Sequence, residues 1–271
     1  MARSFASASS QYLEGTSIPF SSYPLTFSSC FKAVSATRVD GLLTSAASSL
    51  EYKYMGTLTV GSVAGDPVRW QSRFSSGTST SVVPSTTGYS AGTWHNVVGV
   101  TADSTDHAVY LDGGSKGTST TEVDFPTLDR LSIGRLGKNT PVWYADADIA
   151  ECAIWEAALT DSEAAMLGAG YSPLMVRPQS LVAYWPLGGI YGEHDNDIVG
   201  GFNLTAYNTP TWADHPPIIY PSSPTVLRAA AAAAAAAATL TGTVTSSITK
   251  SDIVTGAKTI ILTTSGETWV A

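Results

Sequence analysis

Short apolar runs, several of them alternating with polar residues, recur along the first two thirds of the chain. Turns rich in Gly, Ser and Asp separate these runs at intervals of roughly ten residues, which is the spacing of strands in a β-sandwich. Runs this short favour strands over helices. The predicted strands are Tyr52–Val60, Val68–Phe74, Trp94–Thr101, Ala108–Leu111, Leu128–Ile133, Asp148–Trp155 and Leu181–Leu187.

The stretch 91–113 shows the strand pattern most clearly. A strand that begins at Trp94 is followed by the polar turn Ser104–Asp106 and by a second strand that ends at Leu111. This order predicts a hairpin. His95 lies in the first strand and invites a catalytic interpretation. Because no Ser or Cys nucleophile motif stands near it, we interpret His95 as a structural residue.

One helix is predicted after the closely spaced strands. Thr160 is followed three residues later by Glu163, which is the pattern of a capping box. Ala164–Leu167 continue the helix, and Gly168 or Gly170 ends it. The chain is therefore expected to be all-β with one short helix.

The charge balance limits the classes of partner. Only 13% of the 271 residues are charged, and the formal net charge is −8. An acidic chain without a basic run is a poor ligand for nucleic acid. Neither a membrane-spanning apolar run nor the apolar core of a signal peptide stands out. We therefore expect no nucleic-acid or membrane partner and no export signal.

The two cysteines, Cys30 and Cys152, both lie in apolar strand-like runs. A disulfide between them is one interpretation. Two buried thiols in a chain made in a reducing compartment fit the sequence equally well.

The composition changes after the Pro-rich segment that ends at Pro224. Residues 2–226 are predicted to form one sandwich with a C-terminal extension, whose core covers about residues 2–190. Within the extension, Asp195–Pro217 is expected to be loop-rich, with Trp212 as a packing anchor. Residues 227–251 follow as a linker rich in Ala, Ser and Thr, and ten alanines at Ala229–Ala238 open it. We assign no chemistry to these alanines.

Residues 252–271 are predicted to form a β-hairpin, with strands at Thr259–Thr263 and Thr268–Val270. An isolated hairpin is barely stable in water. The segment is therefore expected to belong to a longer domain or to act as an assembly arm that pairs with another chain. The expected assembly contacts are Thr259, Ile260, Ile261, Leu262 and Trp269.

Several sequence pieces, taken in order, resemble the concanavalin A-like jelly roll in its laminin-G-like form. Two departures stand out: Cys30 replaces a residue that is usually Trp in that family, and Ala150 replaces one that is often Asp. The resemblance implies a concanavalin A-like (laminin-G-like) β-sandwich. The matching pieces are Arg3–Phe5, Tyr12–Glu14, Leu25–Lys32, Gly92–His95, Tyr110–Gly113, Leu131–Gly134 and Asp148–Trp155, followed by Leu159–Thr160.

The segments that follow this module, SPLMVRPQSLVAYWPLGG and WADHPPIIYP, resemble structural proteins of tailed bacteriophages. This resemblance implies a non-enzymatic virion protein: a capsid decoration, fibre or tail-surface subunit. It would be made in the host cytoplasm, and its partners would be other virion proteins or further copies of itself. The alternative is a carbohydrate-binding host-adhesion module that contacts a host glycan. A weaker alternative is a laminarinase-like glycoside hydrolase.

The hydrolase alternative depends on Asp146, Asp148 and Glu151, which approach the E-x-D-x-x-E pattern of laminarinase-like enzymes. In a regular strand, residues 146 and 148 share one face and residue 151 points away, unless a bulge intervenes. The resemblance to the laminin-G-like strand explains the same residues without catalysis. We therefore predict no catalytic residue.

Two sets of residues are candidates for ligand binding. Trp70, Trp143 and Tyr144 lie near predicted turns, where exposed rings could line a glycan site. Acidic residues at a sandwich rim could hold calcium, which is the only cofactor the sequence suggests. The calcium candidates are Glu193, Asp195 and Asp197, with a sparser pair at Asp103 and Asp106.

Overall fold

The computed structural model describes residues 1–59, 65–74, 80–192, 194–221, 239–240 and 269–270. The chain divides into two units, Met1–Ser223 and Pro224–Ala271, and each is described by itself. The strands of the first unit are β1 (Ala2–Phe5), β2 (Tyr12–Gly15), β3 (Leu25–Ala33), β4 (Gly41–Ala46), β5 (Tyr54–Thr59), β6 (Pro67–Arg73), β7 (Thr80–Gly88), β8 (His95–Asp103), β9 (Asp106–Leu111), β10 (Gly114–Ser119), β11 (Arg130–Ile133), β12 (Ala147–Trp155), β13 (Leu181–Trp185), β14 (Thr205–Tyr207) and β15 (Thr211–Ala213). The helices are α1 (Asp161–Gly168) and the short 3-10 turns η1 (Ser7–Ser9), η2 (Pro173–Met175), η3 (Pro178–Ser180) and η4 (Gly189–Tyr191).

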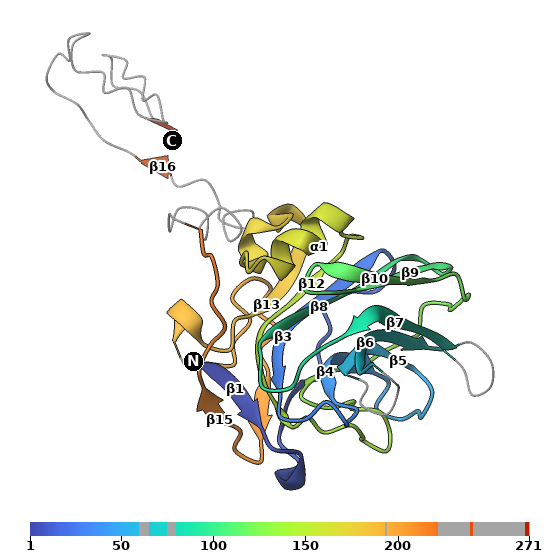
Figure 1. The fold of residues 1–271 in the computed structure, drawn as a ribbon. Coiled ribbons are helices and arrows are strands. Elements are labelled where there is room, and N and C mark those ends of the chain that lie inside the picture. Colours follow the sequence, from blue (N-terminus) through green and yellow to red (C-terminus); the bar gives the residue numbers. More distant parts are fainter. Residues whose placement is uncertain (60–64, 75–79, 193, 222–238, 241–268, 271) are drawn as a thin grey trace, which may run out of the picture. The chain divides into compact units, whose positions relative to one another are not determined.

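Within the described residues, the strands of the first unit form two antiparallel sheets that lie face to face (Figure 1). Sheet A has the order β10-β9-β8-β3-β12-β1-β15, and β13 also pairs with β12. Sheet B has the order β14-β2-β11-β4-β5-β6-β7. The predicted all-β sandwich with one short helix is therefore confirmed.

The main hydrophobic core lies between the two sheets and takes side chains from both. Trp70 of sheet B contacts Phe27 of sheet A edge to face, with the ring centroids 5.2 Å apart. Opposite the indole, sheet A carries Gly99. A Cβ at that position would lie 2.2 Å from the Trp70 ring, so the close approach of the sheets requires glycine there.

A second core covers the outer face of sheet A. It joins Trp155 and Tyr184 of the sheet to Leu167 of α1 and Leu174 of η2. Because both faces of β8 and β12 are buried, these strands are nearly continuous apolar runs rather than alternating ones. The predicted capping box is confirmed at Thr160, where α1 begins.

Residues 204–213, which the sequence predicted to be loop-rich, add a short strand to one edge of each sheet. β14 pairs with β2 in sheet B, and β15 pairs with β1 in sheet A. Trp212 lies against the Arg3 guanidinium, 3.9 Å from Cζ to the ring centroid. The structure thus shows a cation–π contact for this half-buried ring, and its role as a packing anchor stays a prediction.

In the second unit, β16 (Thr239–Leu240) pairs antiparallel with β17 (Trp269–Val270). The other predicted assembly residues, Thr259, Ile260, Ile261 and Leu262, lie outside the described residues. In the first unit, Cys30 and Cys152 are buried free thiols, which removes the disulfide interpretation. Across the described parts of both units, no helix has the length and apolar character needed to cross a bilayer.

Candidate functional site

Tyrosine rings stand side by side on the outer face of sheet B, where β14 meets β2. Leu13 points into the core between the sheets, so its strand neighbours Tyr12 and Glu14 point outward. Tyr207 lies directly across from Tyr12 in the register of the two strands. Their rings are stacked, with centroids 4.6 Å apart and planes 8° from parallel. The pair forms a flat aromatic surface at the edge of the sheet.

Arg135, which is buried, holds this aromatic surface in place. Its Cζ lies 3.4 Å from the centroid of the Tyr12 ring, so Tyr12 is enclosed between the guanidinium and Tyr207. Nη1 of Arg135 also donates to the Tyr144 hydroxyl at 3.1 Å. Burial raises the pKa of the Tyr12 hydroxyl, and the Arg135 charge partly opposes that rise. The Tyr12 phenol is therefore neutral near neutral pH.

Glu14 balances the charge of Arg135. One of its carboxylate oxygens pairs with Nη2 of Arg135 and accepts from the Ser132 hydroxyl at 2.9 Å. The other lies 3.4 Å from Nε of Arg130. A partly buried carboxylate that several donors contact is stabilised more strongly than a carboxylate in an exposed ion pair. Glu14 is thus fixed in orientation and its charge is compensated.

An open pocket of about 360 Å³ lies beside Glu14 and Tyr207, and we call it the rim pocket. Thr205 faces outward on the same side as Tyr207, because alternate residues of a strand share a face. The hydroxyls of Thr16, Ser17 and Thr205 make no hydrogen bond to other described residues, so they remain available. The complete lining is formed by residues 14–17, residues 201–203, Thr205 and Tyr207.

Two of the predicted glycan-site residues lie on the same outer face of sheet B as this pocket. Tyr144 contacts Tyr12 edge to face at 6.0 Å. Trp143 contacts Tyr54 of β5 at 6.1 Å. Both Trp143 and Tyr144 are half-buried. The structure therefore connects Tyr144 to the tyrosine pair, whereas Trp143 packs against Tyr54 of β5, and neither residue lines the rim pocket itself.

The third predicted residue, Trp70, needs a correction. It is fully buried, and its indole N–H donates to the Thr101 hydroxyl at 2.8 Å. β6 starts at Pro67, and its alternation places Val68 and Trp70 on the inner face. Trp70 belongs to the core and does not offer a ring to a ligand.

Asp148 and Glu151, two acidic residues of the hydrolase alternative, point to different parts of the structure. Asp148 pairs with Lys32 at 2.8 Å on the outer face of sheet A. A bulge in β12 turns Glu151, which has a φ of 54° and is 2% exposed. Its carboxylate accepts from the Tyr184 hydroxyl at 2.6 Å and the Tyr220 hydroxyl at 3.1 Å. Asp148 and Glu151 therefore do not form the pair of carboxylates that hydrolysis requires on either side of an open glycosidic bond.

Asp195 and Asp197, two of the predicted calcium residues, have protein partners. Asp195 accepts from Nε of Arg3 at 2.6 Å. Asp197 accepts backbone N–H groups, among them that of Tyr184 at 2.8 Å. Glu193 lies outside the described residues. Within the described chain, no three His, Cys, Asp or Glu side chains are arranged to hold a metal ion.

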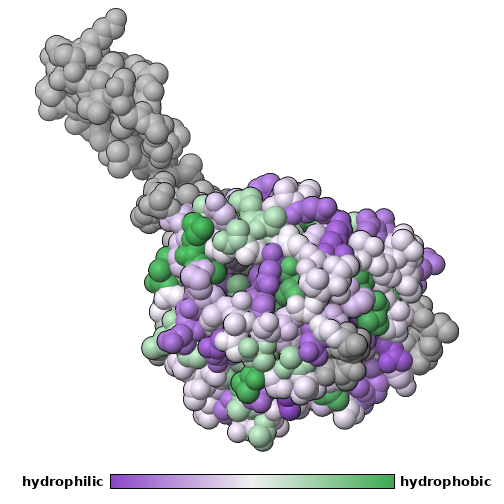
Figure 2. All heavy atoms as spheres, in the orientation of Figure 1, coloured by the Kyte–Doolittle hydropathy of each residue, from purple (hydrophilic) through white to green (hydrophobic). Residues whose placement is uncertain are grey.

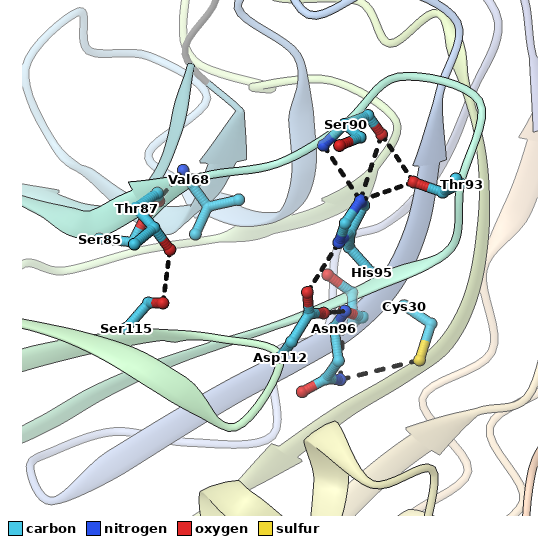
Figure 3. Close-up of polar contacts among 11 residues, drawn as sticks. Cys30, Val68, Ser85, Thr87, Ser90, Thr93, His95, Asn96, Asp112 and Ser115 are labelled. Carbon is cyan, nitrogen blue, oxygen red and sulfur yellow. Dashed lines mark hydrogen bonds and ion pairs between the residues drawn. The ribbon is translucent and has the colours of Figure 1, made fainter. Parts of the chain in front are cut away.

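His95 joins two turns at one end of sheet A (Figure 3). Its Nδ1 lies 2.8 Å from the Asp112 carboxylate, and its Nε2 lies 2.8 Å from the Thr93 hydroxyl. The Thr93 hydroxyl in turn donates to the carbonyl of Ser90 at 2.9 Å. The hydrogen bond to Asp112 raises the pKa of His95, and partial burial opposes that rise. This arrangement ties the segment before β8 to the β9–β10 turn, as expected for a structural histidine.

The residues that form the rim pocket were not predicted from the sequence. Tyr12 and Glu14 appeared only as pieces of a strand pattern, and Tyr207 lay in a segment expected to be a loop. The pairing of β2 with β14 joins residues nearly 200 positions apart. A pattern read along the chain carries no signal for that contact.

Comparisons with known proteins agree with this architecture. Residues 7–165 match the family model described as the concanavalin A-like lectin/glucanases superfamily. Among solved structures, the native heptameric SAP-like pentraxin from Limulus polyphemus aligns with a TM-score of 0.53 at 14% identity, over 74% of this chain and 87% of the pentraxin. A putative carbohydrate-binding protein from Bacteroides ovatus aligns with a TM-score of 0.52 at 17% identity, over 78% of this chain and 58% of that protein. No curated protein sequence matches the chain.

Proposed function

Because the chain belongs to the concanavalin A-like lectin/glucanases superfamily, we propose that it is a non-catalytic carbohydrate-binding protein. Its glycan site is the rim pocket on the outer face of sheet B. The observation that carries this proposal is the ring of Tyr207, which is 41% exposed at the pocket wall and is stacked on Tyr12. An exposed ring in a fixed orientation is a platform for the apolar face of a sugar.

Preorganisation of this platform supports binding. The Tyr207 ring is held by Tyr12, and Tyr12 is held by Arg135. Ordering a side chain at an interface costs about 0.5–1.5 kcal/mol when it is mobile before binding. The stack removes most of that cost at Tyr207, so more of the contact energy is available for affinity.

The polar groups of the rim pocket favour a neutral glycan. Hydroxyls of Thr16, Ser17 and Thr205 can each donate and accept a hydrogen bond, which suits sugar hydroxyls. Among the described residues that line the pocket, the single charged side chain is Glu14. No cationic side chain of the lining would offset the desolvation of a carboxylated or sulfated sugar. Neutral hexoses are therefore the favoured ligands.

The positions of the acidic residues support binding without hydrolysis. Retaining glycoside hydrolases place two carboxyl groups about 5–5.5 Å apart on either side of the glycosidic bond. Here Asp148 is paired with Lys32, and Glu151 is buried beneath Tyr220. In the rim pocket, the Glu14 carboxylate has no second described carboxylate opposite it.

The sequence resemblance predicts that this module is displayed on a bacteriophage virion and that its partners are other virion proteins. Both statements stay predictions. A glycan-binding sandwich is compatible with that location, because a virion surface contacts host polysaccharide. The proposal for the rim pocket does not depend on it.

Substitution of Tyr207 tests the proposed function. The chain is first applied to an array of neutral and acidic glycans, and the best ligand is then titrated by calorimetry. Tyr207→Ala is expected to weaken binding at least about tenfold, and Tyr207→Phe, which keeps the ring, by less than about threefold. Tyr52→Ala is the matched control, because Tyr52 is 39% exposed and does not line the rim pocket. Binding that survives Tyr207→Ala, or absence of any saturable glycan, would reject the rim pocket as a lectin site.

A further inference from the structure

A fully buried carboxylate lies where the β3–β4 connection meets the segment that leads into β12. Asp40, the last residue of that connection, has no exposed side-chain surface. Its Oδ1 lies 3.4 Å from Nε of Arg38, and its Oδ2 has no hydrogen-bond partner in the described structure. Its backbone N–H donates to the Thr59 hydroxyl at 2.9 Å, which fixes the residue to β5. Buried carboxylates normally have close partners, so the charge of Asp40 is poorly compensated.

Backbone hydrogen bonds join residues 34–41 to residues 143–146, and we call this contact the β3–β4 junction. The N–H of Gly41 donates to the carbonyl of Trp143 at 2.8 Å. The N–H of Val34 donates to the carbonyl of Asp146 at 2.9 Å. Because Asp40 lies between these two hydrogen bonds, its carboxyl reaches water only when the junction opens.

The junction is continuous with the aromatic surface of sheet B. Nη2 of Arg38 donates to the backbone carbonyl of Tyr144 at 3.2 Å, and the hydroxyl of the same tyrosine accepts from Arg135 at 3.1 Å. A Cβ at Gly41 would lie 2.6 Å from the backbone of Arg135. The junction therefore packs directly against the residue that positions the stacked tyrosines.

The surroundings of Asp40 favour its neutral form. Burial raises the pKa of Asp40 to about 6, the Arg38 guanidinium partly opposes that rise, and the Asp146 carboxylate adds to it. Burial also raises the pKa of Tyr89, which follows β7, and the charge of Asp40 raises it further. Arg38, Asp146 and Tyr89 are thus the titratable groups that face Asp40 among the described residues. A closed junction binds a proton at this carboxyl more tightly than a solvated aspartate does, whose pKa is about 3.9.

We propose that Asp40 makes the β3–β4 junction sensitive to protons: a neutral Asp40 carboxyl holds the junction closed, and a charged carboxyl makes it open more often. Opening transfers the charge to water and so removes the desolvation penalty. Because the pKa of about 6 in the closed junction exceeds the ordinary value, the stabilisation is complete below about pH 4 and is lost as pH rises through about 6. The order of the adjoining Tyr144 and Arg135 follows the same proton.

Amide hydrogen exchange of the full chain tests the proposal without a ligand. Protection factors of the Gly41 and Val34 amides, corrected for the intrinsic effect of pH on exchange, are measured by NMR from pH 4.5 to 7.5. Protection is expected to fall about tenfold or more over this range. In Asp40→Asn, which is neutral at every pH, it should stay constant within about threefold. Asp106→Asn, at an exposed position of β9, is the matched control and should keep the native pH dependence.

A carboxyl titration keeps the test decisive if the Asp40 variant does not fold. The side-chain carboxyl carbon of Asp40 is followed by NMR in the native chain, and its midpoint is expected near pH 6, together with the loss of amide protection. A midpoint near the ordinary value of about 3.9 overturns the proposal. Equal protection at pH 4.5 and 7.5, or a pH dependence that persists in Asp40→Asn, also overturns it. Tyr207→Ala should leave these readouts unchanged, so failure of the glycan site and failure of this proposal are distinguishable.

Discussion

The outer faces of the two sheets differ in how their aromatic side chains are held. On sheet A, Trp155 and Tyr184 are fully buried beneath α1 and the segments that follow it. On sheet B, Trp143 is half-buried and Tyr207 is exposed, and contacts with other rings and with Arg135 position the sheet B tyrosines. Burial stabilises in proportion to the apolar area removed from water. The covered face therefore contributes stability, while the open face keeps ordered rings available to a ligand.

The surface hydropathy of one face of the molecule shows how exposed apolar residues are distributed. Figure 2 shows strongly hydrophobic residues in small, separate groups on the visible face of the described residues. Scattered exposed apolar residues of this kind are normal for a protein surface and do not require a protein partner. The visible face therefore gives no indication of a large apolar interface.

The largest effect is expected from Trp→Ala substitutions, which can be compared on the covered and the open face. Trp155→Ala removes a fully buried indole whose N–H donates to the carbonyl of Val176 at 2.8 Å. We expect a loss of about 3–5 kcal/mol in the free energy of unfolding, measured by urea denaturation. Trp143→Ala on the open face should cost less, about 1 kcal/mol, because that ring is only partly buried. Similar losses for the two variants would mean that sheet B is as tightly covered as sheet A.

A smaller change in the free energy of unfolding is expected from Tyr→Phe substitutions, which remove one hydroxyl on each face. Tyr184→Phe removes the donor that bonds the buried Glu151 carboxylate at 2.6 Å. The free energy of unfolding should fall by about 2 kcal/mol, because a hydrogen bond to a buried charge is lost. Tyr144→Phe removes a hydroxyl on the half-buried open face and should cost about 0.5 kcal/mol. The reverse order in thermal or urea denaturation would contradict the assignment of the covered and open faces.

The sequence predicted the elements whose signals are local. The capping box at Thr160 involves residues three positions apart, and the hairpin of β8 and β9 is joined by a short polar turn. Strand β12 was recognised because both of its faces are buried, which makes it a long apolar run. These patterns depend on neighbours along the chain, so they can be read without the structure.

The candidate site depends on contacts that no local pattern encodes. β14 and β15 have three residues each, too few to show a period, and β14 is exposed along its whole length. Trp70 was misplaced because the start of β6 at Pro67, which sets the inner face, is not visible in composition. Trp143 and Tyr144 were recognised as aromatic residues near a turn, but the residue that organises Tyr144, Arg135, carries no motif of its own.

The smallest expected effect concerns the margin of the covered face, where His95 bonds Asp112. That hydrogen bond raises the pKa of His95 above the ordinary value of about 6.5. A raised folded-state pKa stabilises the protein fully below the unfolded-state pKa, and this contribution is lost as pH rises through the folded-state pKa. The difference in unfolding free energy between the native chain and Asp112→Asn should therefore be largest near pH 5.5 and shrink by pH 8.5. We expect no more than about 1 kcal/mol, because Asp112 is half exposed. In a His95→Gln background the pH-dependent part should vanish, and a difference that grows with pH would show that another group controls this turn.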